Sequence, residues 1–167
     1  PQVEKVVVVE NGSPNAGELE ALAAVLPNAQ CVFLPENMGI AAAQNKGIQV
    51  ALDDGFDYVT LFDQDSAPAE NMIAMLRQVH AALRGAGEKV AAVGPRLFDP
   101  RLERFLPFYT FAGGHYAPIT AEAGAEFVRT PILISSGQFF HRDVILDAGP
   151  MEAGLFIDHV DHEWGFR

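Results

Sequence analysis

The sequence contains little cysteine and little positive charge, and it lacks a long apolar run. Cys31 is the only cysteine among 167 residues, which excludes an internal disulfide and fits a reducing compartment. Lysine and arginine number 11 against 22 acidic residues, giving a net charge of −11. This balance argues against nucleic acid or anionic lipid as the main partner. No apolar run is long enough to cross a bilayer and no signal peptide is recognisable, so we expect a cytoplasmic protein.

The composition is that of a folded α/β protein. Hydrophobic residues make up 49% of the chain and charged residues 20%, which is ordinary for a globular protein. The length suits one domain with a real core, and the sequence shows no repeats and no linker. We therefore expect a single domain over residues 1–167, with a first half at 1–95 and a second half at 96–167.

Apolar runs and helical patterns alternate in the first half. We expect strands at 6–9, 31–34, 58–62 and 89–93, with Val6–Val9 buried on both faces because it is a continuous β-branched run. We expect helices at 17–26 and 39–54, and a third helix capped by Ser66 with Pro68 in its first turn. This order predicts a Rossmann-like, mostly parallel sheet flanked by helices.

The pattern changes after Pro95. Residues 96–134 mix aromatic residues, glycines and prolines, which indicates irregular or antiparallel structure. Beyond them we expect a strand at 139–140, a short helix at 143–147 and the start of another helix over 158–167. His80 and His141 are interpreted as partly buried histidines, and His115 as a loop residue.

Polar clusters follow three of the expected strands. They are Glu10-Asn11-Gly12-Ser13, Glu36-Asn37-Met38-Gly39 and Asp63-Gln64-Asp65-Ser66. Turns are rich in these residue types, and that alone could explain Asn11-Gly12. However, ligands of open α/β sheets bind at the carboxyl ends of the strands, and neighbouring carboxylates repel one another unless a cation lies between them.

Asp63 and Asp65 give the strongest signal for a cation. Residues two apart on a strand point the same way, so we expect the two carboxylates to converge as half of a Mg²⁺ or Mn²⁺ site. The alternative is a turn aspartate followed by a helix cap, and D-x-D alone is too short to decide between them.

Two further segments carry residues with a possible chemical role. Glycine at position 39 lets backbone approach a ligand at a helix N-terminus, and Asn45 is a poor helix former inside the expected helix. Close packing of small residues is the alternative there. In the last segment, Asp158 and Asp161 share one helical face and His159 shares another with Glu163. These residues could form a solvated face or could include a general base, and they do not match a zinc motif.

Together these motifs resemble the inverting nucleotide-sugar glycosyltransferases with the GT-A fold (glycosyltransferase family 2), and among them the bacterial rhamnosyltransferase-like branch. The resemblance is carried by VVVENGS (7–13), ENMGIAAAQNKG (36–47), LFDQDS (61–66), SSGQFFHR (135–142) and LFIDHVDHEWGFR (155–167). These segments stand in family order across nearly the whole chain.

The resemblance implies a role for each matching position. Glu10 stands where the family usually has an aspartate that contacts the base, and Asp161 matches the catalytic base of a single displacement. Asp63 and Asp65 match the D-x-D whose Mg²⁺ or Mn²⁺ bridges the donor diphosphate. The residues expected to contact the donor are Glu10, Asn11, Asn37, Gly39, Asn45, Asp63, Gln64, Ser136 and Gly137.

The same resemblance implies the partners. The donor is a nucleotide-sugar, with dTDP-rhamnose as one option, and the acceptor is a glycan or a lipid-linked saccharide. Peripheral association with the inner face of the membrane would use segments outside this sequence. The family has a strand before residues 7–13 and continues past Arg167, so we expect a chain truncated at both ends.

Two other functions stay open from the residues. A phosphatase of the haloacid dehalogenase type would use Asp63 as nucleophile and Asp65 as acid and base, with Asp158, Asp161 and Lys89 as further site residues. That type places its D-x-D on the first strand, whereas here two strand–helix units precede it. The other alternative is a non-catalytic module that binds nucleotide-sugar.

Overall fold

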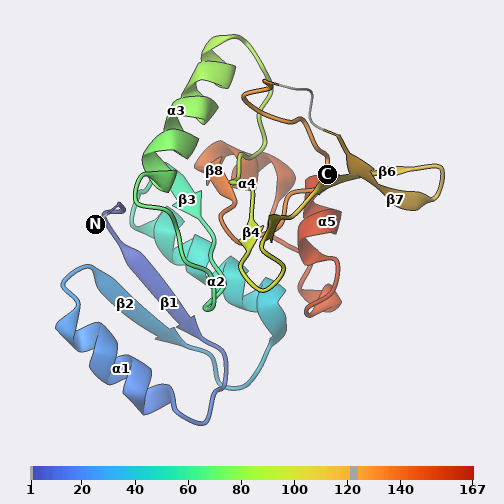
Figure 1. Ribbon diagram of the computed structural model, residues 1–167. Helices are drawn as coiled ribbons and strands as arrows, with labels where there is room; N and C mark the ends of the chain where they lie inside the picture. Colours follow the sequence, from blue (N-terminus) through green and yellow to red (C-terminus); the bar gives the residue numbers. More distant parts are fainter. Residues whose placement is uncertain (1, 121–123) are drawn as a thin grey trace.

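The computed structural model describes residues 2–120 and 124–167, and it confirms the expected α/β class. Helices and strands alternate in the first half of the chain, and most of the short strands lie in the second half (Figure 1). In the described residues the strands form four two-stranded pairs, of which one is parallel and three are antiparallel.

The N-terminal part is built from β1 (Val6–Glu10) and β2 (Ala29–Phe33), which pair in parallel with Val8 opposite Cys31. Helix α1 (Ala16–Val25) packs against β2, and α2 (Gly39–Asp53) packs against β1 (Figure 1). The prediction that the valine run is buried on both faces is wrong. Val6 is 41% exposed and the other valines are half-buried, because β1 pairs with β2 alone among the described strands.

Helix α1 is also less buried than its pattern predicts. Leu19 and Ala23 are half-buried against the sheet, whereas Leu22 and Leu26, expected on the same buried face, are exposed. The two-stranded pair offers one narrow surface, so only part of the helix face finds a partner.

The second strand pair joins distant parts of the chain. β3 (Tyr58–Thr60) runs antiparallel to β8 (Phe139–His141), which confirms the expected strand at 139–140. The strand expected at 89–93 is wrong, because only Val93 forms a bridge, to Phe139. Pro95 follows closely and has no N–H to continue a ladder.

Helix α3 (Met72–Gly85) begins later than expected. The prediction of a cap at Ser66 is wrong, since the helix follows Asn71 and residues 67–70 are not helical. Proline disfavours helical backbone at the residue before it, which explains why Pro68 does not open the helix. Ser66 therefore does not cap α3, and its hydroxyl accepts a hydrogen bond from the Ser136 hydroxyl instead.

The second half is antiparallel, as expected. β4 (Phe98–Asp99) pairs with β5 (Arg104–Phe105), and β6 (Phe108–Ala112) pairs with β7 (His115–Ile119). The β6–β7 hairpin extends from the body of the molecule beside α5 (Figure 1). His115 opens β7 rather than lying in a loop.

The chain ends in three short helices. They are α4 (Arg142–Ala148), the 3-10 helix η1 (Ala153–Leu155) and α5 (Val160–Gly165). The expected helix start at 158 is wrong, because the positive φ of Phe156 and His159 forms a turn before α5. Asp158 therefore does not share a helical face with Asp161.

The main core lies between α2, the β3–β8 pair and the terminal helices. Its members are apolar side chains that are each at most 9% exposed, namely Ala41, Ile48, Val59, Leu61, Phe140, Ile145, Met151, Val160 and Trp164. Within the described residues, no helix is long and apolar enough to span a bilayer.

Candidate active site

The turn after β3 carries the paired aspartates. β3 ends at Thr60, so Asp63 and Asp65 lie beyond the strand in a turn in which Ser66 N donates to Asp63 O (3.2 Å). The expectation that strand alternation aligns them is therefore wrong, and the turn brings them together instead. Asp63 is half-buried, while Gln64 and Asp65 are exposed.

The loop at 135–138 holds this turn in place. Gly137 N donates to Leu61 O (2.7 Å), and Leu61 N donates to Gln138 O (3.0 Å). The Ser136 hydroxyl accepts from Asp63 N (3.4 Å) and donates to the Ser66 hydroxyl (2.7 Å). Ser136 and Gly137, expected near the donor sugar, thus lie directly against the D-x-D turn.

The same loop contacts Asp161 on α5. Ser135 N donates to Asp161 Oδ2 (3.3 Å), and His162 N donates to Asp161 Oδ1 (2.9 Å). Both oxygens of this carboxylate are therefore oriented by backbone amides. The loop at 135–138 is the element that brings Asp161 and the D-x-D turn, almost 100 residues apart in sequence, into one site.

The pKa of Asp63 reflects its surroundings. Burial raises the pKa of Asp63, and the nearby negative charges of Asp65 and Asp161 raise it further. A positive charge between the carboxylates would stabilise their ionised form and would lower the pKa of Asp63 again. The loop at 135–138 contacts both Asp63 and Asp161, and the roles expected for the three acids stay a prediction.

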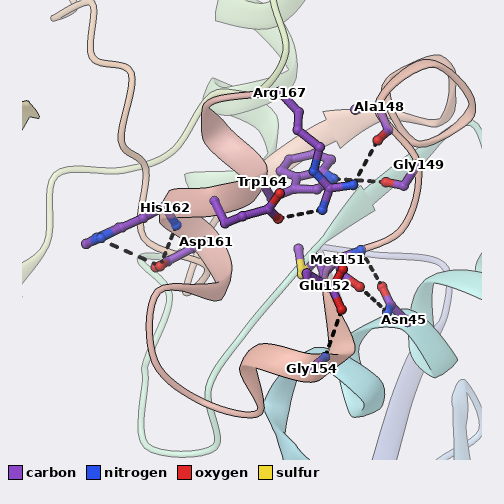
Figure 2. A network of polar contacts seen from close by, with 11 residues as sticks. Asn45, Ala148, Gly149, Met151, Glu152, Gly154, Asp161, His162, Trp164 and Arg167 are labelled. Carbon is purple, nitrogen blue, oxygen red and sulfur yellow. Dashed lines mark hydrogen bonds and ion pairs between the residues drawn. The ribbon is translucent and has the colours of Figure 1, made fainter.

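Helix α5 is held in position from its other side (Figure 2). Trp164 Nε1 donates to Gly149 O (3.0 Å), and the indole packs at 5.3 Å from the Phe140 ring. Arg167 donates to Ala148 O (3.0 Å). Because α5 has only six residues, these contacts, rather than its own length, fix where Asp161 points.

The expected nucleotide-lining residues form a second group, at the carboxyl end of β1. Asn11 Nδ2 donates to Asn37 Oδ1 and to Gly39 O, both at 3.2 Å, and Asn11 Oδ1 accepts from Met38 N (2.9 Å). Ile40 N, in the first turn of α2, donates to Phe156 O (2.7 Å). This contact joins the N-terminus of α2 to the turn that leads into α5.

Glu10 has a local structural task in this group. Its buried carboxylate accepts hydrogen bonds from Gly12 N (3.1 Å) and from Ser13 N. Hydrogen bonds from Ser13 and its neighbours lower the pKa of Glu10. The ionised side chain therefore fixes the turn after β1, and its contact with a nucleotide base stays a prediction.

Asn45, in the middle of α2, bonds to Met151. Its amide donates to Met151 O and accepts from Met151 N, both at 2.8 Å (Figure 2). Both ends of the side chain are thus engaged with backbone of this chain. The structure gives Asn45 a role in packing, and the expected contact with the donor is not tested by it.

The residues fit a divalent cation only in part. In the described ranges, no group of three or more His, Cys, Asp and Glu side chains is arranged to hold a metal ion. Asp63 and Asp65 supply two carboxylates, and their mutual repulsion is what a cation would relieve. Mg²⁺ is commonly bound by one or two carboxylates, with water and substrate phosphates completing the site.

Several residues that contact the site were given no role in it from the sequence. Ser66 was interpreted as a helix cap, and Ser135 contributes only a backbone N–H. The Tyr116 hydroxyl lies 3.0 Å from His162 Nδ1, across 46 residues of chain. Ser136, next to Ser135 in SSGQ, was expected at the donor site, whereas no pattern in the sequence pairs Tyr116 with His162.

Comparison with known proteins identifies the family. The family model described as "Glycosyl transferase family 2" matches residues 1–146. The chain is also 31% identical over 163 residues to "dTDP-rhamnosyl transferase RfbF" of Shigella flexneri, covering 97% of this chain and 53% of the relative. It thus spans about half the length of that curated relative. The chain belongs to glycosyl transferase family 2, and its α/β structure is a form of the GT-A fold of that family.

Proposed function

We propose that the protein transfers a sugar from a nucleotide-diphosphate donor to a hydroxyl group of a glycan or lipid-linked saccharide, with inversion. The observation that carries this proposal is the meeting of Asp161 with Asp63 and Asp65 around the loop at 135–138. Residues 1–95 would bind the nucleotide, and residues 96–167 would face the acceptor. The printed name of the Shigella relative favours dTDP-rhamnose as the donor.

Asp161 would act as the general base. Backbone N–H groups orient both carboxylate oxygens, and its side chain remains 20% exposed, so it can reach a bound hydroxyl. In the proposed step the acceptor oxygen bonds to the anomeric carbon, and the bond from that carbon to the phosphate oxygen breaks. The hydroxyl proton passes to Asp161, and nucleoside diphosphate leaves. Base catalysis of this kind is typically worth about 10²–10⁴ in rate.

Asp63 and Asp65 would hold the divalent cation, Mg²⁺ or Mn²⁺. When bound, the cation supplies positive charge that stabilises the departing diphosphate. The chain's own contribution is to keep two carboxylates together at a fixed turn, through Ser66 N and the Ser136 hydroxyl. A protein of net charge −11 has few cationic side chains for this purpose.

The proposal is tested by thermal unfolding with dTDP-rhamnose, with and without Mn²⁺, followed by an assay of nucleotide release. We expect stabilisation that needs both components, because a ligand that binds only the folded state stabilises it, and more so as its concentration rises above its Kd. Release of phosphate from simple phosphoesters, with no response to any nucleotide-sugar, would contradict the proposal and favour a phosphatase.

A further inference from the structure

The β6–β7 hairpin and helix α5 meet at a cluster of three polar side chains. The Tyr116 hydroxyl, on β7, lies 3.0 Å from Nδ1 of His162, on α5. Nδ1 of His159, the residue before α5, lies 3.2 Å from the same nitrogen of His162. Figure 2 shows the His162 ring pointing away from the buried Trp164 indole, so the cluster lies on the side of α5 that faces away from the core.

Hydrogen bonding explains only one of these two contacts. A ring nitrogen of a neutral histidine either donates one hydrogen bond through its N–H or accepts one at its lone pair. His162 Nδ1 has two polar neighbours, the Tyr116 hydroxyl and His159 Nδ1. A bond to one of them leaves the other contact unexplained. A metal ion bound by all three atoms would account for both contacts.

The spacing of the three atoms fits the ligands of one metal ion. Two nitrogens bound to Zn²⁺ at about 2.0–2.1 Å stand roughly 3.3 Å apart when the two bonds meet at a tetrahedral angle. The observed separations of 3.2 Å and 3.0 Å are close to this value. His159 also has a φ of +62°, which few non-glycine residues adopt and which is often found at ligand sites.

The surroundings of the cluster also favour a cation that prefers nitrogen ligands. Asp161 Oδ1 lies 3.9 Å from His162 Nε2, and a metal-binding histidine usually presents its second ring nitrogen to a carboxylate, a carbonyl or water. Imidazole ligands suit Zn²⁺, Ni²⁺ and Cu²⁺, whereas Mg²⁺ and Mn²⁺ prefer oxygen. The cluster therefore differs in metal preference from the paired carboxylates of Asp63 and Asp65.

We propose that Tyr116, His159 and His162 bind a divalent transition-metal ion, of which Zn²⁺ fits best, and that this ion joins the β6–β7 hairpin to α5. The site has two imidazoles and a phenol, whereas a structural zinc site has four Cys or His ligands, so water would complete the coordination. We therefore expect weaker binding than at a structural site. The inference goes beyond the proposed sugar transfer and does not depend on it.

The test is calorimetric titration of the protein with Zn²⁺ alone, without nucleotide. We expect His159→Gln and His162→Gln each to weaken Zn²⁺ binding at least about tenfold, as for loss of a group that supports or forms a metal site. His115→Gln is the matched control, because His115 is an exposed histidine on the same hairpin. It should bind Zn²⁺ like the wild type. Absence of binding by the wild type, or wild-type affinity in His162→Gln, would overturn the inference.

NMR of the histidine rings locates the ion directly. Addition of Zn²⁺ should shift the Nδ1 resonances of His159 and His162 and should leave those of His115 and His141 unchanged. Shifts confined to His115 or His141 would place the ion elsewhere and contradict the site. Tyr116→Phe removes only the hydroxyl and should weaken Zn²⁺ binding, and an unchanged affinity would contradict the link to the hairpin.

A last comparison separates this site from the cation proposed for the D-x-D turn. Asp65→Asn should bind Zn²⁺ like the wild type. If Asp65→Asn loses Zn²⁺ binding and His162→Gln retains it, the ion lies at the D-x-D turn and the inference is wrong. The same proteins are tested for stabilisation by dTDP-rhamnose with Mn²⁺. Absence of that response contradicts only the proposed transfer, whereas absence of Zn²⁺ binding contradicts only the histidine site.

Discussion

Asn45 on α2 bonds to both backbone polar groups of Met151, donating to its carbonyl oxygen and accepting from its N–H, each at 2.8 Å. Met151 is 2% exposed, so water cannot easily replace this pair of bonds. The contact ties α2, whose N-terminus carries Gly39, to the segment that leads into η1 and α5. The two groups of candidate site residues are thereby connected through the core.

Replacing Asn45 tests this connection. We expect Asn45→Ala to lower the free energy of unfolding by about 1–3 kcal/mol for each buried backbone group left without a partner. Urea denaturation measures the loss. Gln49→Ala on the same helix removes only an exposed contact with Asp53, and it should change stability by less than about 0.5 kcal/mol. Equal effects of the two variants would show that the Met151 contact is not important.

Gly39 is where the N-terminus of α2 meets the turn before α5. Its φ is +84°, and a Cβ there would lie 2.5 Å from Phe156 O. Gly55 has a similar φ of +81° but nothing within 4 Å of its Cβ position, so it is a matched control. We expect both alanine variants to lose about 1–2 kcal/mol from left-handed backbone.

The comparison of these two glycine variants isolates the overlap with Phe156. Gly39→Ala should lose a further 1–3 kcal/mol or so, as for overpacking in a core, and should weaken nucleotide-sugar binding. Urea midpoints and thermal shifts report the two effects. If Gly39→Ala and Gly55→Ala are equally stable, the close approach of Phe156 to α2 is incorrect.

His80 makes stability depend on pH. Its side chain is fully buried beside Tyr58 and Phe139, and burial, with the charges of Arg84 and His141, lowers the pKa of His80. In the unfolded chain the His80 imidazole is protonated as the pH falls through about 6.5, whereas in the folded protein it is protonated only at lower pH. The contribution of His80 is therefore fully present above that pH and is lost as the pH falls towards the lower folded pKa.

His80→Leu should remove this part of the pH dependence. Denaturation of the wild type and the variant at several pH values below about 6.5 gives the two slopes. The variant should lose less stability on acidification. His115→Leu, at an exposed position, is the control for replacing a histidine by leucine. A slope unchanged by His80→Leu would mean that His80 takes up its proton as readily in the folded protein as in the unfolded chain.

Asp65 is expected to contribute to donor binding by holding the divalent cation. Asp65→Asn should abolish the part of dTDP-rhamnose stabilisation that needs Mn²⁺ and should leave the fold intact, because Asp65 is exposed. Chelation of the metal from the wild type should have the same effect. Asp57→Asn is the control. Asp57 is exposed and directly precedes β3, whereas Asp65 follows it, so this variant should retain the Mn²⁺ response. A full Mn²⁺ response in Asp65→Asn would remove this residue from the proposed cation site.

The sequence predicted those parts of the fold that depend on local pattern. The valine run of β1, the helices α1 and α2, and the polar residues after each strand follow from periodicity and turn chemistry. The predicted element boundaries were wrong near two prolines. These are Pro68, before the start of α3, and Pro95, shortly after the bridge at Val93. The prediction that Val6 and Leu22 are buried was wrong. Burial depends on which elements lie beside a strand or helix, and a local sequence pattern does not determine that.

The candidate site shows the same division. Asp63, Asp65 and Asp161 could be selected from strand ends and from the family motifs. Ser135, whose backbone N–H donates to Asp161, carries no side-chain signal. The bonds of Asn45 to Met151 join residues 106 positions apart, which no local pattern predicts. Tyr116 lies on the β6–β7 hairpin and contacts His162, and no spacing in the sequence predicts this contact.

The role of Asp161 is the central claim, and one comparison tests it most directly. Asp161→Asn keeps the size of the side chain and removes the base, while Asp158→Asn makes the same change at an exposed residue before α5. Both variants are assayed for sugar transfer and for binding of dTDP-rhamnose in the presence of Mn²⁺. The account predicts that Asp161→Asn loses about 10²–10⁴ in turnover while binding the donor normally, and that Asp158→Asn retains activity. Transfer by Asp161→Asn at the wild-type rate would contradict it.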